Sequence, residues 1–211
     1  MMEITILDRV LLLLTGIVAV YLIFRFIQET RAAETKPRHN IHYIIAFAVL
    51  FVSGVLIIIF GFDILARPCI KTVATILPFA LAMGLICEFF KKLRVLYLVV
   101  LLGGLILIGL ETFGVFELKI IYPIFHAIAG LTIFFVPILA VSKEMAPKGF
   151  IWVTVGGAII GIGGIALAFL GAGKPLLGIF TEELVFAILT PILLAMSLGF
   201  AYGFMKKIYN K

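Results

Sequence analysis

The stretch from residue 10 to residue 27 reads VLLLLTGIVAVYLIFRFI and carries one charged side chain, Arg25. A helix of about 20 apolar residues can cross the hydrocarbon core of a bilayer, because it pairs its backbone polar groups within itself. Further stretches of this kind follow at 43–62, 72–90, 95–110, 120–141, 150–170 and 184–205. The sequence therefore predicts an all-α, polytopic membrane protein with seven transmembrane helices.

The composition supports this prediction. Apolar residues make up 64% of the 211 residues and charged residues 13%, whereas a soluble domain keeps a more polar surface. The longest polar connection, 28–40, is too short to fold alone, so we expect residues 1–211 to form a single transmembrane domain. The opening residues, Met1 to Glu3, lack a basic region, and we therefore expect the first apolar stretch to be a permanent helix rather than a removable leader.

The basic residues fall unevenly on the two sides of the predicted bundle, and cytoplasmic loops of membrane proteins retain Lys and Arg. The side that includes the N-terminus carries Arg9, Arg67, Lys71, Lys119 and Lys174. The opposite side carries the other 12 of the 17 Lys and Arg residues. We therefore expect a protein of the plasma membrane with its N-terminus outside and its C-terminus in the cytoplasm. Anionic lipid head groups at the inner face are the partner that this charge predicts, and nucleic acid is not.

An internal repeat is indicated by two matching segments. Residues 74–85 and 187–198 are identical at six of twelve positions without a gap, including Pro78 and Pro191. This match predicts two repeat halves, 1–94 and 119–211, joined by a linker helix at 95–110 in a three-plus-one-plus-three order. A chance match among Leu, Ile and Ala is the alternative. The layout resembles that of the SWEET sugar transporters and the KDEL receptor, but their Pro-Gln pair is missing here because Gln28, the only glutamine, follows Ile27.

Small residues recur at helical spacing in the last two predicted spans, where they let helix backbones approach closely in lipid. They are Gly157, Gly161, Gly164 and Ala168, followed by Ala195, Gly199 and Gly203. We expect tight helix packing; a seam along which helices slide is the alternative. The same faces would serve contacts within one chain, in a homo-oligomer or in a larger membrane complex.

Polar groups near the outer ends of the spans form the predicted ligand-binding site. His126 is the ionisable side chain that lies clearly inside a span, and Tyr122 precedes it by one helical turn. Its imidazole has an ordinary pKa of about 6.5, which suits a proton-responsive group. We expect an outward-facing pocket for a proton, a cation or a small polar solute, bounded by His126, Tyr122, Asp8, Asp63, Glu183 and Thr190.

Several of these charged groups also have a purely structural interpretation. Glu183 follows Thr181 in the first turn of the seventh span, where an acidic side chain favours the helix dipole. The imidazole of His126 would be satisfied by a carbonyl or a hydroxyl group. On the inner side, we expect Glu88 to pair with Lys91 or Lys92.

Two classes of function remain. The first is a small transporter-like, channel-like or receptor-like module that uses the outer pocket. The alternative is a redox subunit of a respiratory assembly that binds b-type haem, or a quinone near His42 and Arg38. Haem commonly takes two His ligands at matching depth, whereas His39 and His42 begin the second span and His126 lies toward the other side. Serine-hydrolase, zinc-protease and phosphate-loop motifs are absent from the sequence, so neither catalysis nor a cofactor or metal site is predicted.

Overall fold

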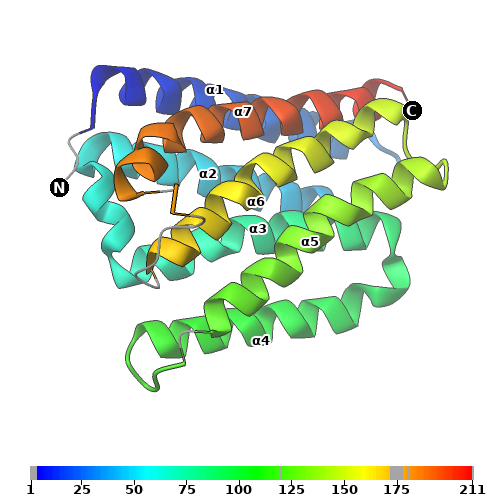
Figure 1. Cartoon of the computed structure of the whole chain (residues 1–211). Coiled ribbons are helices and arrows are strands. Elements are labelled where there is room, and N and C mark those ends of the chain that lie inside the picture. Colours follow the sequence, from blue (N-terminus) through cyan, green and yellow to red (C-terminus); the bar gives the residue numbers. More distant parts are fainter. Residues whose placement is uncertain (1–3, 119, 172–177, 180, 211) are drawn as a thin grey trace.

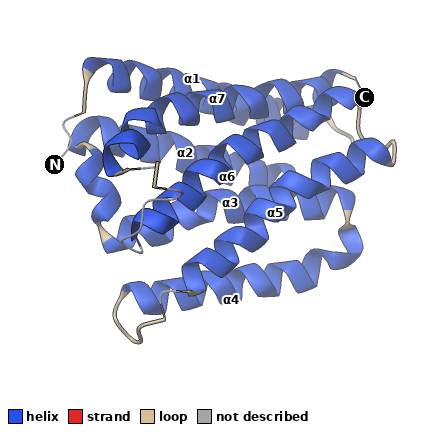
Figure 2. Cartoon of the chain, viewed as in Figure 1, coloured by secondary structure: helices blue, strands red, loops and turns tan. Residues whose placement is uncertain are grey.

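The computed structural model describes residues 4–118, 120–171, 178–179 and 181–210, and within these ranges the chain forms helices and no strands (Figure 2). Seven helices are long and apolar enough to cross a membrane, which confirms the predicted number of apolar helices. They are α1 (Ile6–Ala32), α2 (Asn40–Phe60), α3 (Pro68–Phe89), α4 (Arg94–Thr112), α5 (Ile121–Ser142), α6 (Trp152–Gly171) and α7 (Glu182–Tyr209). Three short 3-10 helices connect them: η1 (Phe62–Ala66), η2 (Lys91–Leu93) and η3 (Lys148–Ile151).

Helices α1 and α7 begin before the predicted spans because capping residues, rather than the apolar run, set where they begin. Thr5 and Asp8 form a capping box at the start of α1, in which each side chain accepts from the other's backbone N–H. At the start of α7, the Thr181 hydroxyl accepts from the backbone N–H of Leu184 at 3.3 Å. Glu183 lies in the first turn of α7, as predicted.

Six of the helices form a closed circuit of contacts. The seven helices lie roughly along one another, as Figure 1 shows. Helix α1 packs against α2 and α7, α2 packs against α3, α3 against α5, α5 against α6, and α6 against α7. Helix α4 lies outside this ring, against α3 and α5. We call the end of the bundle where α1, α3, α5 and α7 begin the N-terminal face, and the opposite end the C-terminal face.

The contact between α6 and α7 depends on glycine. A Cβ atom at Gly199 would lie 3.2 Å from Cα of Gly156, and one at Gly203 would lie 2.8 Å from the backbone nitrogen of Val153. Close packing at Gly199 and Gly203 agrees with the small-residue prediction. The prediction is wrong for Ala195, which is exposed, and for Gly161, where an added Cβ would have no neighbour within 4 Å. Helical spacing predicted which small residues share a face of each helix. It did not predict at which positions along the helices the two backbones come close.

Aromatic side chains fill the interior of the ring toward the C-terminal face. Six of them have 2% exposure or less: Phe26, Tyr43, Phe47, Phe150, Phe200 and Phe204. The ring centroids of Tyr43 and Phe204 are 4.7 Å apart, and those of Phe26 and Phe204 are 5.2 Å apart. Contacts at these distances contribute stability beyond simple burial. The aromatic cluster surrounds the charged group described next.

Candidate functional site at the C-terminal face

The Glu88 carboxylate lies in the last turn of α3, and both of its oxygens are engaged. Nζ of Lys207 lies 2.6 Å from each oxygen. The Tyr43 hydroxyl donates to Oε2 at 2.8 Å, and Nε2 of His39 lies 3.3 Å from Oε1. The Glu88 side chain is 12% exposed. The Lys207 ammonium group and the Tyr43 hydroxyl donate hydrogen bonds to the carboxylate, and the His39 imidazole lies beside it. Groups from α7 and from the start of α2 thus compensate a charge that is largely removed from solvent.

The Lys207 ammonium group is enclosed by aromatic rings. Its side chain is 5% exposed. The nitrogen lies 5.4 Å from the ring centroid of Tyr43 and 5.4 Å from that of Phe150. The centroids of Phe204 and Phe89 lie at 5.5 and 5.9 Å. The negative faces of aromatic rings attract a cation at such distances, so the rings complete the environment that the Glu88 carboxylate begins.

Two local features of the chain make this arrangement possible. Gly84 precedes Glu88 by one helical turn, and the Tyr43 ring occupies the space beside its Cα. The tyrosine therefore lies close against α3 with its hydroxyl at the carboxylate. The 3-10 helix η3, which follows Pro147, inserts Phe150 into the core with 0% exposure.

The Glu88–Lys207 pair joins helices that are not neighbours in the ring. Helices α3 and α7 are separated by α2 and α1 on one side and by α5 and α6 on the other. The two long side chains therefore span the interior of the ring and meet near the C-terminal face. A buried ion pair of this kind has a large desolvation cost, and removal of one partner leaves an uncompensated charge.

The expected pairing of Glu88 with Lys91 or Lys92 is wrong. Helix α3 ends at Phe89, and both lysines lie in η2, where they are exposed. The Glu88 side chain instead points into the bundle, toward α7. A sequence signal for this site was available: an acidic residue within an apolar span, on the side of the protein that is rich in Lys and Arg.

At the N-terminal face, the structure brings together two of the predicted site residues, Asp8 and Thr190. The Thr190 hydroxyl donates to Oδ1 of Asp8 at 2.6 Å, which links α7 to α1. Oδ2 of Asp8 accepts from the hydroxyl of Thr5 at 2.6 Å and from its backbone N–H at 3.0 Å. Thr190 is fully buried. Two residues of the predicted site, one from the first helix and one from the last, therefore lie in direct contact.

Tyr122 and His126 form a second pair, on α5, with ring centroids 5.3 Å apart. Nε2 of His126 lies 3.3 Å from the position of a Cβ atom at Gly164, so the imidazole packs against the glycine face of α6. Its Nδ1 atom is buried and has no hydrogen-bond partner among the described residues. An unpaired polar atom in this setting costs free energy.

The remaining two predicted site residues, Asp63 in η1 and Glu183 in α7, are exposed. Within the described ranges no hydrogen bond or ion pair joins them to the Asp8–Thr190 pair or to the Tyr122–His126 pair. Helix α6 lies between α5 and α7 in the ring, so the two pairs are on helices that do not contact each other directly. A single pocket formed by all six residues remains a prediction.

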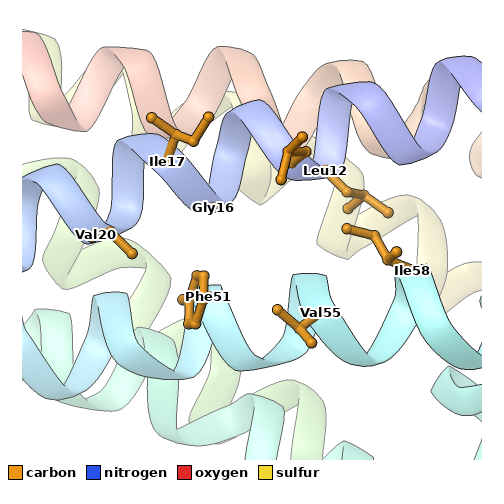
Figure 3. A pocket seen from close by; sticks show the side chains of 8 residues that line it. Leu12, Gly16, Ile17, Val20, Phe51, Val55 and Ile58 are labelled. Atoms are coloured by element: carbon orange, nitrogen blue, oxygen red, sulfur yellow. The ribbon is translucent and has the colours of Figure 1, made fainter.

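Two hollows lie elsewhere on the molecule. An apolar groove of about 200 Å³ runs between α1, which contributes Leu12, Gly16 and Val20, and α2, which contributes Phe51 and Val55 (Figure 3). It contains none of the predicted site residues and faces outward, where lipid would surround a membrane protein. A second hollow of about 400 Å³ lies at the C-terminal face and includes Lys36, Arg38 and His42.

The histidines occupy separate places. His39 faces Glu88, His42 lines the hollow at the C-terminal face, and His126 packs against α6. In the part of the chain that the structure describes, no three His, Cys, Asp or Glu side chains are grouped so that they could hold a metal ion. No observation in the structure favours the haem alternative.

Comparison with known protein families, with characterised proteins and with solved structures gives no match for this chain. The function is therefore inferred from its own residues.

Proposed function

We propose that this protein is a small transporter-like or channel-like module that moves a proton, a cation or a small polar solute across the membrane. The observation that carries the proposal is the Glu88–Lys207 pair, which lies inside the ring between helices that are not neighbours. Charged side chains within a membrane bundle are expensive and mark pathways, relays and gates. A pair needed only for stability would more simply join adjacent helices.

In this proposal the pair is a gate at the C-terminal face. Its contacts reach α2 through Tyr43, α3 through Glu88, η3 through Phe150 and α7 through Lys207. Separation of the carboxylate from the ammonium group would let water reach both charges and would release several elements from one another at once. The described conformation has the gate closed, because both charges are paired and enclosed by aromatic rings.

The polar groups near the N-terminal face of the bundle would form the entrance. His126, Tyr122, Asp8, Thr190, Asp63 and Glu183 remain the proposed ligand-binding set. The buried, unpaired Nδ1 of His126 supports this part of the proposal, because an approaching donor or a proton would satisfy it.

The finer topology is also proposed. The excess of Lys and Arg at the C-terminal face supports a position in the plasma membrane with the N-terminus outside and anionic lipids at the inner face. The ring supports duplication: if α1, α2 and α3 match α5, α6 and α7, then the α3–α5 contact corresponds to the α7–α1 contact. Pro78 and Pro191 lie inside α3 and α7, as that correspondence requires. Helix α4 would be the linker.

The proposal can be tested in liposomes that contain the purified protein and the pH-sensitive dye pyranine. An inward proton gradient is imposed with valinomycin and potassium, and a parallel series follows uptake of radioactive rubidium. We expect the double variant Glu88→Met with Lys207→Met to admit protons or rubidium faster than the wild type, because an apolar pair cannot hold α3 to α7 by charge. Glu34→Gln, a change at an exposed carboxylate on the same face, is the matched control.

Addition of His126→Leu to the double variant should then reduce the faster flux, since the entrance would lose its polar group. Equal flux in the wild type, the double variant and the Glu34→Gln control for both ions would contradict the gate.

A further inference from the structure

The hollow at the C-terminal face has a composition that the proposed gate does not explain. It lies between the last turn of α1, the connection to α2 and the first two turns of α2. Its lining residues are Thr30, Lys36, Pro37, Arg38, Ile41, His42 and Ile44. Three side chains that carry or can accept a positive charge thus share about 400 Å³ with apolar groups.

None of these three side chains has an anionic partner in the part of the chain that the structure describes. Among the described residues, no ion pair or hydrogen bond engages the side chains of Lys36, Arg38 or His42. The nearby carboxylate of Glu29 instead accepts a hydrogen bond from Nδ2 of Asn40 at 3.1 Å. The hollow therefore has uncompensated positive charge that an external anion would neutralise.

The backbone at the start of α2 also makes the hollow more positive. Helix α2 has 21 residues and begins beside the hollow, and its N-cap, His39, makes no capping hydrogen bond with its side chain. The start of a helix has partial positive charge. The backbone N–H groups of Asn40 and His42 already donate to the carbonyls of Pro37 and His39, so the helix contributes this charge rather than a full set of free donors. These features favour phosphate over a neutral group.

The position of the hollow along α2 indicates which kind of molecule supplies the anion. The basic side chains lie in the connection and the first turn of α2, at the level where its membrane span begins. Ile41 follows directly and is 52% exposed, and Ile44 continues the apolar lining by one turn. The basic side chains therefore come first along α2 and the apolar ones follow. A matching ligand has a phosphate where the membrane span begins and a hydrocarbon chain that extends from it along the span.

We propose that this hollow binds the phosphate head group of an anionic membrane phospholipid, with an acyl chain against Ile41 and Ile44. Lys36 and Arg38 contact the phosphate, and His42 lies at the inner edge of the head group. The inference does not depend on transport.

The test measures lipid retained by the purified protein in detergent, by native mass spectrometry, during titration with phosphatidylglycerol or phosphatidylcholine. We expect the protein to prefer phosphatidylglycerol. The double variant Lys36→Gln with Arg38→Gln should weaken that binding about thirtyfold, the factor expected for the loss of two cationic contacts. Lys91→Gln with Lys92→Gln, which removes two exposed charges from η2 on the same face, is the matched control and should leave the affinity unchanged.

Three outcomes would overturn the proposal. Equal retention of the two lipids would mean that the hollow does not recognise an anionic head group. Equal losses in the two double variants would show general attraction to a basic face rather than a site. Binding of inorganic phosphate that depends on Lys36 and Arg38 but is not displaced by phosphatidylglycerol would identify a site for a free anion. Displacement of phosphate by the lipid would support the proposal.

Discussion

The ring of Tyr43 occupies the space that a side chain at Gly84 would need. Cδ1 of the tyrosine would lie 2.6 Å from a Cβ atom there, and Tyr43 is itself fully buried. Glycine at position 84 therefore allows an aromatic side chain of α2 to approach α3 and to place its hydroxyl on Glu88.

Gly84→Ala should displace Tyr43 and weaken its hydrogen bond to Glu88. We expect a loss of about 1 to 3 kcal/mol of stability, the usual effect of overpacking in a filled core, measured by thermal melting in detergent. Gly130→Ala in α5 is the control, because an added Cβ there meets nothing within 4 Å. Similar melting temperatures for the two variants would show that the Tyr43 ring moves aside without cost.

Glu88 and Lys207 should be strongly coupled in a double-mutant cycle. Glu88→Met and Lys207→Met alone should each cost about 3 to 5 kcal/mol, because each leaves one buried charge without its partner. The two changes together should cost less than either alone. Thermal melting measures all four proteins, and Lys206→Met, at an exposed neighbouring lysine on α7, should have little effect. Additive losses would mean that the pair is not an energetic unit.

The hydrogen bond between Thr190 and Asp8 should contribute to the attachment of α7 to α1. Thr190→Val keeps the shape of the side chain but removes the donor, and we expect a loss of about 1 to 2 kcal/mol by thermal melting. Thr190→Ser keeps the hydroxyl and is the comparison. If valine and serine are equally destabilising, the lost interaction is a packing contact rather than the bond to the carboxylate.

His126→Leu separates a functional from a structural role. The substitution removes a buried polar atom to which the described residues offer no hydrogen bond, so the melting temperature should equal or exceed that of the wild type. Ion flux through the protein in liposomes should fall at the same time. Reduced stability with unchanged flux would assign His126 to packing alone.

The native Cys69 reports the orientation. It is exposed and lies at the start of α3, on the N-terminal face. A maleimide that cannot cross membranes should label it in intact cells if the N-terminus is outside, and Cys69→Ser should remove the signal. Ser142→Cys in the Cys69→Ser background adds an exposed thiol at the end of α5, on the C-terminal face, and should react only after the membrane is opened. The reverse labelling pattern would place the C-terminus outside.

The site at the C-terminal face was much less predictable than the helices. Leu12 and Glu88 illustrate why: an apolar residue in a long apolar run can be assigned to a span from its neighbours alone, whereas a carboxylate has several cations within reach along the chain. Lys91 and Lys92 are the closest in sequence, but α3 turns Glu88 toward Lys207 on a helix more than a hundred residues away. Thr190 is an intermediate case, since the sequence placed it in the same predicted pocket as Asp8 but did not predict the hydrogen bond between them.

The sequence by itself determined the number of apolar helices and their approximate bounds, because hydrocarbon requires about 20 apolar residues for each crossing and this requirement is local. It also determined where the positive charge is concentrated along the chain. The tertiary structure decided which helices form the ring, which glycines meet a neighbour and which cation meets Glu88. Those outcomes depend on how seven helices pack against one another, and such packing is set by contacts between residues that are far apart in the sequence.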